Sequence, residues 1–144
     1  MLEGLLGRLR NKREAKPQAD PQLAAAVLLL EVARADFGNH PLELDAVRKA
    51  LAEEFSLTPD ALDLLMAGAQ KESQAAVSLH DYVQTLNSTK SADEKRALIR
   101  RLWQVAYADG KIEALEEHTL RRLADLLYVP HADFIRGKLA ATDS

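Results

Sequence analysis

The feature that most restricts the fold of this chain is an internal repeat at a spacing of 73 residues. Residues 32–43 align without a gap with residues 105–116: both stretches open with Val-Ala-Xaa-Ala-Asp and close with Glu. The match continues to Val47 and Leu120, and a slip of one residue is needed to pair Leu57 with Val129. Two copies of a helix–turn–helix predict two related halves that pack across a shared core, and they are too few for a solenoid.

Composition favours an all-α fold. Alanine and leucine dominate, aromatic residues make up only 5% of the 144, and glycine (6) and proline (5) are few. Alanine and leucine lose little on entering a helix, whereas strands favour β-branched and aromatic residues. The length suits one domain. We therefore predict a basic N-terminal segment and linker over residues 1–19 and one domain of about seven helices over 20–144.

Helix-capping signals divide the chain. Asp20 precedes Pro21 and an apolar helix that we expect to be central, and Thr58 precedes the proline that opens a later helix. Ser78 and Ser91 each stand three residues before an acidic residue, so each predicts a capping box. The expected helices cover about 20–36, 41–55, 58–69, 82–86, 91–109, 113–127 and 130–140.

An acidic turn in the second copy is the strongest chemical signal. Asp109 is followed by Gly110, then by Ile112 and Glu116, which is the spacing of the second half of a calcium-binding EF-hand loop. The first half of such a loop is missing, because Val105 and Tyr107 stand where carboxylates would be needed. The sequence therefore does not predict an orthodox EF-hand.

The first copy supplies a second acidic pair. Asp36 and Glu43 match Asp109 and Glu116, and if the halves pack together the four carboxylates converge. Such a cluster suits a hard, oxygen-preferring cation such as Ca²⁺ or Mg²⁺. The alternative is structural, since aspartate caps turns and glutamate is favoured at the positive end of a helix dipole.

No other motif in the sequence indicates a catalytic site. The chain has no cysteine, no G-x-S-x-G, no glycine-rich phosphate loop and no H-E-x-x-H, so nothing predicts an enzyme. The four histidines are expected at the surface. Arg96 and Arg100 share a helix face and could contact phosphates, but a net charge of −3 argues against nucleic acid as a partner.

The N-terminal segment differs in charge from the rest. Residues 1–16 carry five basic and two acidic side chains, a net charge of +3, which leaves −6 for the remainder. Residues 2–13 form a predicted amphipathic helix that either docks on the domain, binds a protein partner or contacts an anionic membrane. We expect a cytoplasmic protein, with peripheral contact at the inner face of the membrane as an option. The candidate contact residues are Leu5, Arg8, Leu9, Arg10, Lys12 and Arg13.

Residues 106–117, A-Y-A-D-G-K-I-E-A-L-E-E, and the leucines that follow resemble the TerB-like family of helical domains, found in tellurite-resistance proteins and at the N-terminus of the co-chaperone DjlA. The resemblance covers about residues 20–140. It implies an all-α fold in two related halves, a metal-binding acidic cluster, a bacterial stress-response or adaptor role, and no catalytic activity. The first copy departs from the pattern, with Phe37 in place of Gly110, so the implied metal site is lopsided.

Overall fold

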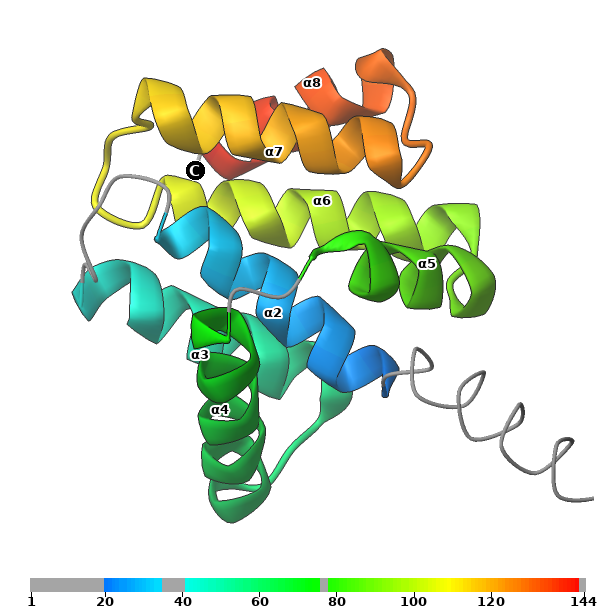
Figure 1. Ribbon diagram of the computed structural model, residues 1–144. Coiled ribbons are helices and arrows are strands. Elements are labelled where there is room, and N and C mark those ends of the chain that lie inside the picture. Colours follow the sequence, from blue (N-terminus) through cyan, green and yellow to red (C-terminus); the bar gives the residue numbers. More distant parts are fainter. Residues whose placement is uncertain (1–19, 35–40, 76–77, 143–144) are drawn as a thin grey trace, which may run out of the picture.

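The computed structural model describes residues 20–34, 41–75 and 78–142, and over these residues all of its regular secondary structure is α-helix (Figure 1). This confirms the predicted all-α class; the helix expected over residues 2–13 lies outside the described residues. The helices are α2 (Pro21–Ala33), α3 (Pro41–Phe55), α4 (Pro59–Gln74), α5 (His80–Thr89), α6 (Ala92–Ala106), α7 (Ala114–Leu126) and α8 (His131–Thr142).

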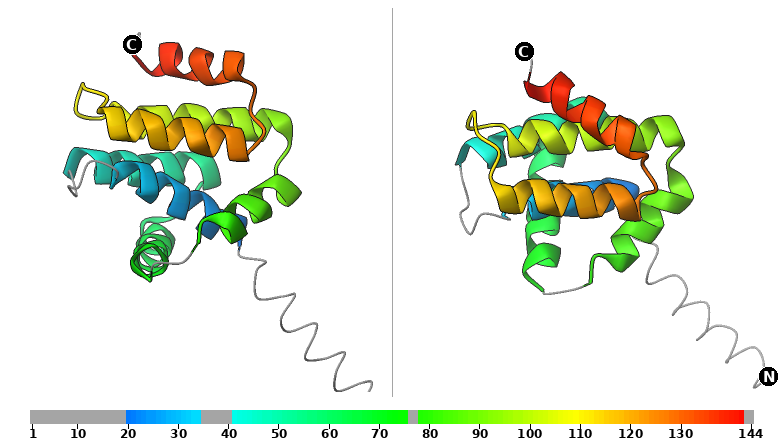
Figure 2. Two further views of the ribbon diagram at one scale, coloured as in Figure 1. Left: turned by 45° about the horizontal axis from the view of Figure 1, so that its top comes forward. Right: turned by 90° about the horizontal axis from the view of Figure 1, so that it is seen from above.

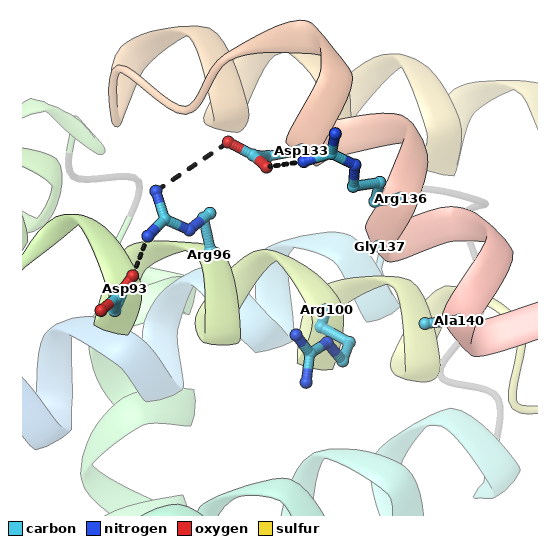
Figure 3. A pocket seen from close by; sticks show the side chains of 7 residues that line it. All are labelled: Asp93, Arg96, Arg100, Asp133, Arg136, Gly137 and Ala140. Atoms are coloured by element: carbon cyan, nitrogen blue, oxygen red, sulfur yellow. Dashed lines mark hydrogen bonds and ion pairs between the residues drawn. The ribbon is translucent and has the colours of Figure 1, made fainter.

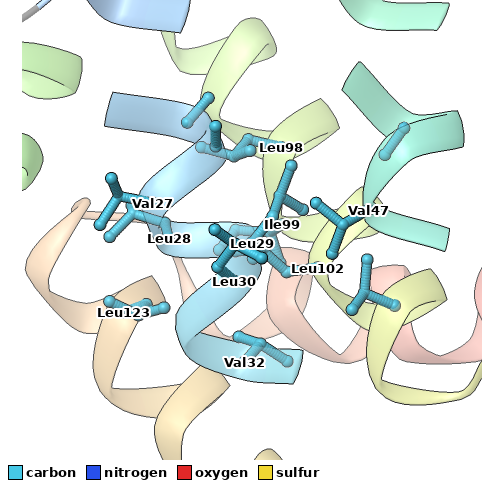
Figure 4. Close-up of a cluster of buried hydrophobic side chains, with 14 of the residues drawn as sticks. Val27, Leu28, Leu29, Leu30, Val32, Val47, Leu98, Ile99, Leu102 and Leu123 are labelled. Atoms are coloured by element: carbon cyan, nitrogen blue, oxygen red, sulfur yellow. The ribbon is translucent and has the colours of Figure 1, made fainter. Parts of the chain in front are cut away.

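Helix α2 lies at the centre of the bundle. It begins where Oδ1 of Asp20 accepts a hydrogen bond of 3.0 Å from the backbone N–H of Gln22, as the capping signal predicts. Helices α3, α4, α5, α6 and α7 all pack against α2, and nearly every residue from Ala24 to Ala33 is buried (Figure 4). A helix that is apolar all round is stable only in such a position.

The helix boundaries confirm the repeat. Helix α2 ends at Ala33 and α6 at Ala106, while α3 begins at Pro41 and α7 at Ala114; both pairs are 73 residues apart. The side chains of Val47 and Leu120, paired by the same offset, are both fully buried. The two helix–turn–helix units are thus equivalent in structure as well as in sequence.

The one-residue slip is also visible in the backbone. Ser56 (φ 51°) and Tyr128 (φ 60°) both adopt the left-handed conformation that ends a helix, and they are 72 residues apart. Helices α4 and α8 then begin at Pro59 and His131, again 72 apart, and α4 packs on α2 as α8 packs on α6. The repeat therefore extends to three helices, with α5 between the copies.

Helix α8 approaches α6 closely at one point. Trp103 of α6 is fully buried and its indole N–H donates a hydrogen bond of 2.9 Å to the carbonyl of Phe134 in α8. The two aromatic rings lie 4.9 Å apart between centroids. A Cβ atom on Gly137 would stand only 3.0 Å from the Trp103 ring, so glycine is what allows this spacing.

No helix among the described residues is both long and apolar enough to cross a membrane.

A pH-dependent contact joins α5 to α4. The Tyr82 hydroxyl donates a hydrogen bond to Oε2 of Glu72, and burial, together with this carboxylate, raises the pKa of Tyr82 to about 12. In the unfolded chain the hydroxyl titrates near its ordinary value of about 10. The folded state therefore holds the proton longer, and stability falls as the pH rises from about 10 to 12.

We expect Tyr82→Phe to remove most of this alkaline loss of stability. Denaturant unfolding at a series of pH values measures it. Tyr128→Phe is the matched control, because Tyr128 is 79% exposed. A Tyr82→Phe profile parallel to that of the unmodified chain between pH 10 and 12 would contradict the assignment.

Candidate functional site

Asp109 shapes the turn between α6 and α7. Its Oδ1 accepts a hydrogen bond of 3.0 Å from the backbone N–H of Lys111, and the N–H of Gly110 donates to the carbonyl of Tyr107 at 2.9 Å. Gly110 has φ of 85°, a conformation that L-residues rarely adopt, which explains glycine at this position. Asp109 is half-buried, so one part of its carboxylate is committed to the turn and another part reaches solvent.

Glu116 lies in the first turn of α7 and is fully buried. Its Oε1 accepts a hydrogen bond of 3.2 Å from the backbone N–H of Glu113, the residue just before the helix. This contact is one half of a capping box, an interaction of the kind that the sequence offers as the alternative to metal binding. The position is also favourable for a negative charge, since the N-terminus of a helix carries a partial positive charge.

Glu43 occupies the equivalent position in the first copy. It is the third residue of α3, as Glu116 is of α7, and it too is fully buried. Among the described residues only Thr85 is another buried polar or charged side chain. Carboxylates are rarely buried completely, because removing one from water costs free energy unless partners compensate. That the same burial occurs in both copies indicates that this location has a function in the fold or in binding.

The four helix ends that flank the two turns lie at one end of the molecule. The last residues of α2 and α6 and the first residues of α3 and α7 all lie on the left of Figure 1, and the two views of Figure 2 agree. Glu43, Glu116 and Asp109 belong to these ends, so the structure brings three of the four predicted acidic residues to the same end. Asp36, the fourth, lies outside the described residues.

The described side chains do not by themselves complete a metal site. Over residues 20–34, 41–75 and 78–142 no three histidine, aspartate or glutamate side chains gather closely enough to hold an ion. The predicted set of four includes Asp36, and His40 is the nearest histidine in sequence; both fall in the range 35–40 that the structure leaves undescribed. The assignment of these four residues as cation ligands therefore stays a prediction.

The predicted N-terminal contact surface also lies outside the described residues. It comprises Leu5, Arg8, Leu9, Arg10, Lys12 and Arg13.

A hollow between α6 and α8 escaped the sequence analysis. It has a volume of about 490 Å³ and is shown in Figure 3. Its lining comprises Asp93, Arg96, Arg100, Asp133, Arg136, Gly137 and Ala140. The sequence placed Arg96 and Arg100 on one face of a helix, but no periodicity shows that α8 sets Arg136 and Asp133 opposite them.

The family model described as tellurite resistance protein TerB matches residues 22–139, which cover all seven described helices except the first residue of α2 and the last three of α8. Neither the curated proteins nor the solved structures contain a match to the chain.

Proposed function

The chain belongs to the TerB family and is therefore a tellurite-resistance-related helical module; from this premise we propose that it acts without catalysis, by binding a divalent cation and a protein partner. The cation is Ca²⁺ or Mg²⁺, and its ligands come from the two acidic turns, Asp36 with Glu43 and Asp109 with Glu116. The observation that carries the proposal is the full burial of Glu43 and Glu116 at equivalent positions of α3 and α7.

Burial at equivalent positions is informative because the two copies differ elsewhere. The first copy lacks the glycine of the second, yet it keeps the glutamate. Carboxylates brought to one end of a protein repel each other, and a bound cation relieves this repulsion. Carboxylate and backbone carbonyl oxygens are the ligands that Ca²⁺ and Mg²⁺ prefer, and turns supply both.

A pair of exposed leucines favours a protein partner at the same end. Leu42 and Leu115 immediately precede the two buried glutamates, and they are 54% and 48% exposed. Both stand at the second residue of their helix, 73 residues apart. A single exposed leucine needs no explanation, but two at equivalent positions beside the acidic turns provide apolar contacts for a partner.

A thermal-melt series of the metal-stripped chain tests the cation. A ligand that binds only the folded state stabilises it by about 2.7 kcal/mol at one hundred times its Kd. For a domain of this size that corresponds to a rise in Tm of roughly 5–10 °C. We expect such a rise with Ca²⁺ or Mg²⁺, and a smaller one or none with Zn²⁺, which prefers nitrogen and sulfur ligands.

The variant for this experiment is Asp109→Asn with Glu116→Gln, which keeps the side-chain volumes and removes two charges. We expect it to lose the cation-dependent rise. Asp60→Asn with Asp125→Asn is the matched control: it removes the same charge from two exposed residues and leaves the rise intact. The proposal would be contradicted if no cation raised the Tm, or if the rise in Tm were equal in the two double variants. The acidic turns would then have a purely structural role.

The second role that the sequence offers is an adaptor recruited by the basic segment of residues 2–13, with the acidic turns purely structural. It rests on residues outside the described ranges and stays a prediction, as does a cytoplasmic location with peripheral contact at the membrane.

A further inference from the structure

A groove runs along α3 where this helix packs beside α6. Val47 of α3 and Ile99 of α6 belong to the buried core of the bundle (Figure 4), and the groove lies on the outside of this contact. Its volume is about 430 Å³. Its lining comprises Leu42, Asp45, Ala46, Lys49, Ala50, Glu53, Gln104 and Ala108. The lining residues of α3 recur every three or four positions, so they form one face of that helix.

The groove has an apolar part that leaves room for a helix. Ala46 and Ala50 of α3 and Ala108 of α6 are small residues, and Leu42 at one end is 54% exposed. An amphipathic helix binds such a groove by placing apolar side chains, spaced three or four residues apart, against it.

Acidic side chains outnumber basic ones along the groove. Glu53 and Glu54 both pair with Arg101 of α6, at 3.2 and 2.7 Å, so two carboxylates face one guanidinium group. Asp45 lines the groove and makes no ion pair within the described part of the chain, and Lys49 is the basic residue of the lining. These five side chains carry a net charge of −1, which favours a basic occupant.

The segment of residues 2–13 matches the groove in length, charge and apolar pattern. The groove extends along α3 over residues 42–53, and the predicted helix has the same number of residues, so each is about 17 Å long. The segment belongs to residues 1–16, whose net charge is +3. Its apolar face is formed by Leu2, Leu5, Leu6 and Leu9.

The connection to α2 is long enough for this contact. Helices α2 and α3 run in opposite directions, so the end of α3 lies on the same side of the molecule as Asp20, where α2 begins (Figure 1). Residues 14–19 span about 20 Å when extended, whereas the axes of packed helices are roughly 8–10 Å apart. Because the segment is tethered, its effective concentration at the groove exceeds that of a separate molecule.

We propose that residues 2–13 dock as a helix in the groove between α3 and α6, with the leucines against the alanines and the basic residues toward Glu53. This inference does not rest on the proposed cation binding. The docked segment covers Leu42, one of the two exposed leucines that we propose for a protein partner. The segment therefore competes with that partner for the same surface.

A nitroxide label on the segment tests the docking in the full chain. The chain has no cysteine, so Asn11→Cys provides a single attachment point, on the side of the predicted helix opposite the leucines. We expect paramagnetic broadening of the backbone amide resonances of residues 46–53 and 104–108, compared with the same chain after reduction of the label. Absence of this broadening, or broadening centred on another part of the chain, would overturn the proposal.

A mixture of two chains distinguishes the chain's own segment from that of a second copy. The labelled chain without nitrogen-15 is mixed with an equal amount of nitrogen-15 chain that carries no cysteine. We expect no broadening in the second chain, and broadening of its groove resonances would overturn the proposal in favour of an exchange between copies. In the labelled chain, Leu5→Ser with Leu9→Ser should abolish the broadening.

Two double variants of the domain test the groove itself. Leu42→Ser with Ala46→Arg removes an apolar contact and places a bulky positive charge in the groove, so we expect the broadening to be lost. Leu64→Ser with Ala67→Arg is the matched control: it makes the same two substitutions at exposed residues of α4 and should leave the broadening intact. An equal loss in both variants would contradict the assignment of the groove.

The Asp109→Asn/Glu116→Gln variant should keep the broadening. Failure of the cation proposal and failure of the docking proposal are therefore separate results.

Discussion

Replacing Trp103 with alanine is expected to lower the free energy of unfolding by about 3–5 kcal/mol, the usual cost of truncating a fully buried aromatic side chain. The indole fills the contact between α6 and α8, packs against the Phe134 ring and lies so near α8 that a Cβ atom on Gly137 would stand 3.0 Å from it. Alanine would leave a cavity and remove the hydrogen bond to the Phe134 carbonyl. Urea denaturation followed by circular dichroism measures the change.

The Trp103→Phe variant separates the contribution of the buried volume from that of the hydrogen bond. It keeps most of the volume and loses the indole N–H, so we expect a smaller loss, of about 0.5–1.5 kcal/mol for one hydrogen bond to a carbonyl inside α8. A Trp103→Ala chain as stable as the unmodified one would show that α8 does not depend on this contact.

The second large effect is expected at the centre of the bundle. Leu28 of α2 is fully buried, and Leu28→Ala should cost about 2–5 kcal/mol by lost burial and cavity formation. Leu64→Ala makes the same chemical change on α4 at a residue that is 76% exposed, and it should alter stability by no more than about 0.5 kcal/mol.

The same urea denaturation compares the two variants. Similar losses in both would mean that α2 is not the shared core of the two halves.

The repeat made most of the fold predictable from the sequence. A gap-free offset of 73 residues requires that both copies fold alike, and the paired ends of α2 and α6 confirm this. Local signals placed several helix starts: the Ser91 hydroxyl accepts from the Glu94 N–H at 3.1 Å, and the Glu94 carboxylate accepts from the Ser91 N–H at 2.9 Å. Both contacts lie within four residues, so the sequence contains all that determines them.

The predicted capping box at Ser78 was wrong. Its hydroxyl accepts from the N–H of His80 at 3.1 Å, two residues on, and Leu79, the residue just before α5, makes no side-chain capping hydrogen bond. Serine favours this tight local turn about as readily as a helix cap, and sequence spacing does not distinguish them.

Less of the candidate site than of the fold could be predicted from the sequence. The spacing of Asp109 and Glu116 identified the turn, but the complete burial of Glu43 and Glu116 depends on how the two halves pack. The hollow lined by Arg96 and Arg136 depends in the same way on the register of α8 against α6, which follows from the Trp103–Gly137 contact. The hydrophobic periodicity of one segment does not show which distant segment it contacts, or in which register.

The central claim is that both acidic turns contribute to one cation site at one end of the molecule. Its most direct test is Mn²⁺ titration of the full chain followed by paramagnetic broadening of the backbone amide resonances. We predict that broadening begins together in residues 109–113 and in the first turn of α3 around Glu43, at substoichiometric Mn²⁺. Broadening confined to one of these segments, or centred on Asp93 and Asp133, would contradict the claim.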